Sequence, residues 1–174
     1  CSSDLVYTGS MTSQDPPVVA FENQFATRTA TLSISKKVEQ EYPGDTPEIP
    51  ADGFAFTVVF GDGTDTTTSY PYTKSDGTTG TITSGGTIKL GYDQTAVFSD
   101  IPVGTKYNIT EILGELADDY VVSVNGNKNV TSASGTMQVG NNVVTVVNTY
   151  TQHFTDLTIT KTGAQMNLDE NQSF

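Results

Sequence analysis

Cysteine and histidine are almost absent from this chain of 174 residues. Cys1 is the single cysteine, so no disulfide can form within the chain, and we expect it to be either a lipid-modified start or an end left by processing. His153 is the single histidine and lies in a spacer between two apolar segments, so neither a catalytic triad nor a histidine-rich metal site is expected. The sequence predicts no cofactor.

Long apolar runs and positive charges are also scarce. No run approaches the roughly 20 apolar residues of a membrane-spanning helix, so no membrane crossing is predicted within this segment. The chain has 8 basic against 20 acidic side chains, a net charge of -12, and would repel a polyanion such as nucleic acid. Only 16% of its residues are charged, whereas Thr, Ser, Gly and Asn are abundant. This composition is typical of polar β surfaces and turns, and predicts an all-β protein.

An internal repeat organises the sequence. The apolar segment Val18–Phe25 (VVAFENQF) returns 125 positions later as Val143–Tyr150 (VVTVVNTY). After a short spacer in each copy, LSISK at Leu32–Lys36 is matched by LTITK at Leu157–Lys161. A repeat with the period of one domain predicts a tandem array. We therefore expect a linker and the last strand of a preceding repeat in residues 1–30, a complete domain in 31–151, and a spacer and the first strand of a following repeat in 152–174.

The central segment alternates between short apolar runs and Gly-, Pro- and Asp-rich connections. This pattern predicts about eight strands, no amphipathic helix, and hence a β-sandwich. The predicted strands cover residues 31–38, 54–60, 81–83, 87–90, 94–99, 106–112, 120–124, 137–139 and 143–150. Loops are predicted at 39–53 and 61–80, a hairpin turn at Gly85-Gly86, a brief helical turn at 114–119 and a tight turn at Asn125-Gly126.

Three polar residues occupy positions where the alternation requires an apolar side chain: Lys36, Glu111 and Asn148. Burial favours the neutral form of each ionisable group, which makes the lysine a nucleophilic amine and the glutamate a carboxylic acid. Such an acid, placed beside a carboxamide, can hydrogen-bond the amide carbonyl oxygen and so polarise the carbonyl carbon. It can also transfer a proton to the departing ammonia. The predicted product is a Lys–Asn isopeptide bond. The alternative lysine, Lys37, would point inward only if the strand register slipped by one residue.

The segments that carry these residues resemble the Cna-B-type and streptococcal pilin isopeptide domains of Gram-positive surface proteins. LSISKKV matches the lysine-bearing first strand, FSDIPVGTKYNITE the segment with the acid, and VVTVVNTY the terminal strand with the asparagine. The resemblance covers about residues 31–151 and implies an Ig-like (Cna-B-type) sandwich in which Glu111 promotes a spontaneous, single Lys36–Asn148 cross-link. It also implies that Asn23 and Lys161 are the cross-link positions of neighbouring repeats. Because no sortase motif, membrane anchor or pilin-type lysine motif is present, an internal segment is expected.

The resulting expectation is a structural stalk or fibre module of a surface adhesin or pilus, located outside the cell and attached to its wall. Its expected partners are adjacent repeats and a host or cell-surface ligand. The alternative is a ligand-binding adhesin module that uses loops 39–53 and 61–80, with Tyr70 and Tyr72 exposed in the second loop. A hydrolytic enzyme is poorly supported, because the candidate acid is expected inside the core. The Asp-rich GDGTD segment lacks the spacing of an EF-hand and predicts a solvated turn, so no metal site is expected.

Overall fold

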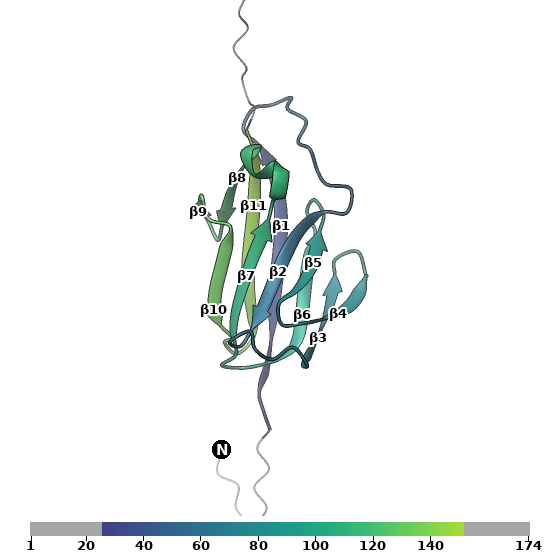
Figure 1. Cartoon of the computed structure of the whole chain (residues 1–174), viewed down its shortest axis with the longest axis vertical. Coiled ribbons are helices and arrows are strands. Elements are labelled where there is room, and N and C mark those ends of the chain that lie inside the picture. Colours follow the sequence, from purple (N-terminus) through teal and green to yellow (C-terminus); the bar gives the residue numbers. More distant parts are fainter. Residues whose placement is uncertain (1–25, 152–174) are drawn as a thin grey trace, which may run out of the picture.

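Two β-sheets packed face to face form the protein, as a computed structural model shows (Figure 1). The structure describes residues 26–151, so the expected strand at 18–25 and the positions Asn23 and Lys161 lie outside the described residues. The elements are β1 (Thr29–Gln40), β2 (Phe54–Phe60), β3 (Ser69–Lys74), β4 (Thr79–Thr83), β5 (Gly86–Leu90), β6 (Thr95–Pro102), β7 (Lys106–Ile112), the 3-10 helix η1 (Gly114–Asp118), β8 (Tyr120–Val124), β9 (Asn127–Lys128), β10 (Ser132–Thr136) and β11 (Asn141–Tyr150). The predicted all-β sandwich is confirmed.

The larger sheet has seven strands in the order β4-β3-β6-β1-β11-β8-β9, and the smaller has four in the order β10-β7-β2-β5. Strict alternation explains why these segments form strands with one buried face. In β2, for example, Phe54, Phe56, Val58 and Phe60 are buried while the residues between them are half-buried. The core therefore lies between the two sheets.

The first and last strands are neighbours at the centre of the larger sheet. β1 and β11 run parallel, with ten residue pairs from Thr31 opposite Asn141 to Gln40 opposite Tyr150. Because the strands are parallel, the chain enters the sandwich at one end and leaves it at the other (Figure 1). A pull on the two ends would load this strand pair along its length.

Several local predictions match the structure. The bounds of β2, β7 and β8 are those predicted, and η1 occupies the expected helical turn. Asn125 and Gly126 both have positive φ, 49° and 81°, and connect β8 to the short strand β9. Positive φ at both central residues is the backbone conformation that an Asn-Gly pair favours in a two-residue hairpin turn.

The predicted hairpin at Gly85-Gly86 is wrong. β4 pairs with β3 in the larger sheet and β5 with β2 in the smaller, so the chain crosses between the sheets at this point. The buried hydroxyl of Ser84 accepts a hydrogen bond from the Phe60 amide and donates one to the Phe60 carbonyl, each 2.8 Å long. These bonds hold the crossover against β2, which a turn signal alone does not reveal.

The predicted 61–80 loop contains a strand, β3, and its tyrosines are not exposed. Tyr70 is 8% exposed and its ring lies 4.1 Å from that of Phe60, while Tyr72 packs against Phe98 at 5.5 Å. The Gly-, Asp- and Thr-rich composition of the segment predicted a loop, and Pro71 is tolerated in the strand because it lies beyond the part of β3 that pairs with β6. The main support for a ligand-binding second loop is thereby removed.

The predicted strand at 137–139 is also wrong. The strand in this region is β10, SASGT, which precedes it and pairs with β7 at the edge of the smaller sheet. β10 contains no large apolar residue, so it gives no periodic hydrophobic signal. Met137, just after it, is fully buried, and that burial accounts for the apolar pattern without a strand.

Candidate functional site

A lysine, a glutamate and an asparagine meet inside the sandwich. Lys36 on β1 and Asn148 on β11 project inward from adjacent strands of the larger sheet, and Glu111 on β7 faces them from the smaller sheet. Lys36 and Asn148 have no exposed surface and Glu111 is 4% exposed. The structure therefore brings together the three residues that the alternation had singled out.

One carboxylate oxygen contacts both nitrogens of the cluster. Glu111 Oε1 lies 3.2 Å from Lys36 Nζ and accepts a hydrogen bond of 2.9 Å from Asn148 Nδ2. Lys36 Nζ also donates to the backbone carbonyl of Lys37 at 3.1 Å. Within residues 26–151, Glu111 Oε2 and Asn148 Oδ1 are buried without a hydrogen-bond partner. Buried polar atoms without a partner are costly, and each of them needs a physical explanation.

Burial shifts both ionisable groups toward their neutral forms. It lowers the pKa of Lys36 to about 8, although the charge of Glu111 opposes the change. It raises the pKa of Glu111, against the opposing effects of Lys36 and of the hydrogen bond from Asn148. Near neutral pH an appreciable fraction of Lys36 is therefore an uncharged amine, which is the form that can act as a nucleophile.

The neighbouring lysine lies on the other face of the strand. Lys37 is exposed, whereas Leu32, Ile34 and Val38 are buried on the same side as Lys36. The face assigned to Lys36 by alternation is thus the face that it occupies.

One aromatic ring lies against the lysine amine and two more extend from it, and sequence reasoning did not identify these rings as part of the site. Lys36 Nζ lies 4.3 Å from the centroid of the Phe54 ring. The ring of Tyr120 meets Phe54 edge-on at 5.7 Å and Tyr150 at 5.5 Å. Phe54 and Tyr120 each begin a predicted strand, but only the tertiary contacts connect them to Lys36.

Residues 30–150 match the sequence profile of a domain of unknown function, DUF7601. The chain belongs to the DUF7601 family. No curated protein matches it significantly.

Solved structures similar to this DUF7601 domain come from pili. The pilus-presented adhesin Spy0125 is 21% identical, with 71% of this chain and 27% of that chain covered and a TM-score of 0.52. The major pilin of Streptococcus pyogenes is 18% identical, with coverage of 71% and 48% and a TM-score of 0.51. The T3.2 major pilin of the same species is 17% identical, with coverage of 73% and 46% and a TM-score of 0.52. The domain spans about a quarter to a half of these proteins and shares their fold.

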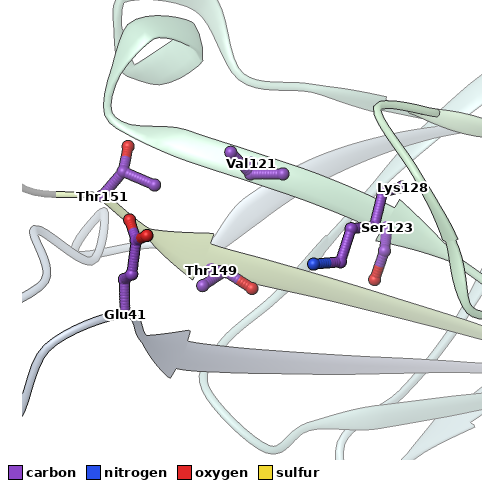
Figure 2. A pocket seen from close by; sticks show the side chains of 6 residues that line it. All are labelled: Glu41, Val121, Ser123, Lys128, Thr149 and Thr151. Carbon is purple, nitrogen blue, oxygen red and sulfur yellow. The ribbon is translucent and has the colours of Figure 1, made fainter.

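A second candidate site on the DUF7601 domain is a small pocket on the outer face of the larger sheet (Figure 2). Its volume is about 150 Å³ and it is lined by Glu41, Val121, Ser123, Lys128, Thr149 and Thr151. Thr149 points outward here, whereas the preceding residue, Asn148, points into the core. The pocket therefore lies on the opposite side of β11 from the buried cluster.

The Asp-rich segment GDGTD forms turns that nearby threonines stabilise. Asp65 accepts hydrogen bonds from the hydroxyls of Thr67 and Thr68, and Asp62 accepts one from Thr64, as in solvated turns. No group of three or more His, Cys, Asp or Glu side chains with metal-binding geometry occurs in residues 26–151. In the same part of the chain no helix is long and apolar enough to cross a membrane.

Proposed function

We propose that this DUF7601 domain is a structural module of a bacterial surface adhesin or pilus, stabilised by an isopeptide bond that forms spontaneously between Lys36 and Asn148. The observation that carries the proposal is the position of Glu111 Oε1, in contact with both Lys36 Nζ and Asn148 Nδ2. Formation of the isopeptide bond requires Lys36 Nζ to lose a proton and Asn148 Nδ2 to gain one. Glu111 contacts both, and is the catalytic residue.

The reaction needs no external reagent. The neutral amine of Lys36 attacks Cγ of Asn148, so that a new C–N bond forms and the bond from Cγ to Nδ2 breaks. Glu111 takes up one proton from the attacking nitrogen and supplies one to the departing nitrogen, which leaves as ammonia. The carboxyl group ends with the protonation it had at the start. The bond forms once in each molecule, so the process is maturation and not enzymatic turnover.

The position of the bond suits a mechanical role. Lys36 lies near the end of β1 and Asn148 near the end of β11, two parallel strands that connect to opposite ends of the sandwich. A tensile load entering at Thr29 would pass along β1, through the cross-link and out through the last residues of β11. The 111 residues between Lys36 and Asn148 in the sequence would carry none of it.

The proposed context is a tandem array on the cell surface. The repeat of the β1 and β11 sequences at Leu157–Lys161 and Val18–Phe25 supports it, with residues 1–28 and 152–174 belonging to linkers and neighbouring units, since Thr29 and Ala30 are part of β1. In such an array Asn23 would be linked to a lysine of the preceding domain and Lys161 to an asparagine of the following one. The pilus origin of the similar folds is consistent with an extracellular, wall-attached location and with other subunits as partners.

Intact mass of the folded chain tests the proposal. We expect the mass calculated from the sequence less one ammonia molecule, and fragment spectra that join the peptides containing Lys36 and Asn148. Glu111→Gln should restore the full calculated mass. Lys37→Ala is the matched control, because Lys37 is exposed, and should retain the loss. A folded wild-type chain of unchanged mass would refute the cross-link.

A further inference from the structure

A loop connects the two sheets near the end of the sandwich that is closest to the buried cluster. Residues 41–53 leave the end of β1 and run down one side of the sandwich to the start of β2 (Figure 1). The loop is held at its midpoint by the hydroxyl of Tyr120, which donates a hydrogen bond of 2.6 Å to the Glu48 carbonyl. At its start, the Glu41 amide donates to the Tyr150 carbonyl at 3.0 Å.

Tyr120 connects this loop to the lysine amine through one intervening ring. Its own ring packs edge-on against Phe54 at 5.7 Å, and the Phe54 ring lies 4.3 Å from Lys36 Nζ. Tyr120 is 5% exposed and Phe54 is 2% exposed. Burial raises the pKa of Tyr120 to about 12, so its hydroxyl remains protonated, and able to donate, throughout the physiological range.

We propose that Tyr120 is a positioning residue for the cross-link: by holding the middle of the 41–53 loop at Glu48 and packing against Phe54, it keeps water away from the Lys36 amine. This assignment rests on the proposed isopeptide function and concerns a different residue and a different step. Tyr120 touches neither reacting atom. It acts by setting the environment in which the amine loses its proton.

The physical basis is the sensitivity of a buried amine to hydration. Desolvation is the largest cause of the lowered pKa of Lys36, about 8 against 10.5 for an ordinary lysine. At pH 7, a return to 10.5 would reduce the fraction of neutral amine by roughly 300-fold. The ionisable groups around the amine and its aromatic neighbours are Glu111 from β7, Tyr120 from β8, Tyr150 from β11, and Asp119 and Glu48 from the connections. Of these, Tyr120 joins the middle of the loop to the Phe54 ring through its side chain, whereas Tyr150 contacts only the start of the loop, through its backbone carbonyl.

The test measures the ionisation of Lys36 directly in an unlinked chain. Asn148→Leu removes the carboxamide while approximately preserving its volume, so that the amine stays free. In this full-length background, the pKa of Lys36 is measured by NMR of 13C-labelled lysine, with and without Tyr120→Phe. The phenylalanine keeps the ring and removes only the hydroxyl. Tyr72→Phe is the matched control, since Tyr72 is half-buried on β3 and packs against Phe98.

We expect Tyr120→Phe to raise the pKa of Lys36 by about one unit or more, and Tyr72→Phe to leave it unchanged. A second variant, Pro47→Gly with Pro50→Gly, loosens the loop around Glu48 without altering Tyr120 and should raise the pKa in the same direction. Equal values for both tyrosine variants, or no change in the proline variant, would overturn the assignment. The mass of the wild-type chain decides the cross-link separately, so failure of one proposal is distinguishable from failure of the other.

Discussion

Removing the acid should change how the domain extends under force. In the Glu111→Gln variant the cross-link cannot form, and a pull on the two ends loads the ten residue pairs of β1 and β11 in shear. Once this pair separates, the whole sandwich unravels. The 111 residues between Lys36 and Asn148 then add roughly 370–400 Å of extended chain, at about 3.3–3.6 Å per residue.

The wild-type chain should show no such extension. The load would enter along β1 as far as Lys36 and leave through the last residues of β11, and strand residues are already close to full extension. These segments should therefore lengthen by only a few ångströms, because the rise per residue in a β-strand is already close to that of a fully extended chain.

Single-molecule force spectroscopy on the chain held between flanking marker domains measures this difference. A wild-type chain that releases several hundred ångströms would refute the load path, even if its mass showed the cross-link. Thermal unfolding gives an independent measurement. Closure of a 111-residue loop contributes about 5 kcal/mol in the entropic model, which corresponds to a Tm roughly 20 °C lower in Glu111→Gln.

Two further predictions concern stability. In an Asn148→Leu chain, Lys36 has a pKa of about 8 when folded and 10.5 when unfolded. Between these pH values the unfolded state holds one more proton than the folded state. The free energy of unfolding should therefore rise by about 2–3 kcal/mol from pH 8 to pH 10. Denaturant titrations measure this slope, and adding Lys36→Met should abolish it. Gly80→Ala would place a Cβ 2.6 Å from the Tyr72 hydroxyl and should cost about 1–2 kcal/mol, whereas Gly91→Ala, with open space, should be neutral.

Alternation predicted the strands that have one buried face, and with them the buried cluster. β2, β7 and β8 were found to the residue because each alternates between core and surface. Lys36, Glu111 and Asn148 were identified for the same reason, since each is a polar exception on an otherwise apolar face. A period of two fixes which side of a strand a residue occupies, and thus which polar groups must meet in the core.

The features that escaped prediction depend on contacts between elements. β10 is an edge strand of small residues without a hydrophobic period, and β3 follows a Gly-, Asp- and Thr-rich stretch and contains a proline, both of which argue against a strand. The crossover from β4 to β5 depends on hydrogen bonds of Ser84 to Phe60, far away in the sequence. The contact of Tyr120 with Glu48 spans 72 positions, and no local pattern encodes it.

The adjacent lysines allow a test of what selects the reacting amine. A one-residue slip of β1 would turn Lys37 inward, but it would also expose Leu32, Ile34 and Val38, which are now buried beside Lys36. Each lost burial costs about 1.5–3 kcal/mol, roughly 5–9 kcal/mol for the three, which is comparable to the whole stability of a small domain. Lys36→Ala should therefore keep its calculated mass, with no bond through Lys37. Ammonia loss in that variant would mean that the apolar neighbours do not fix the register, and that the lysine is selected by some other contact.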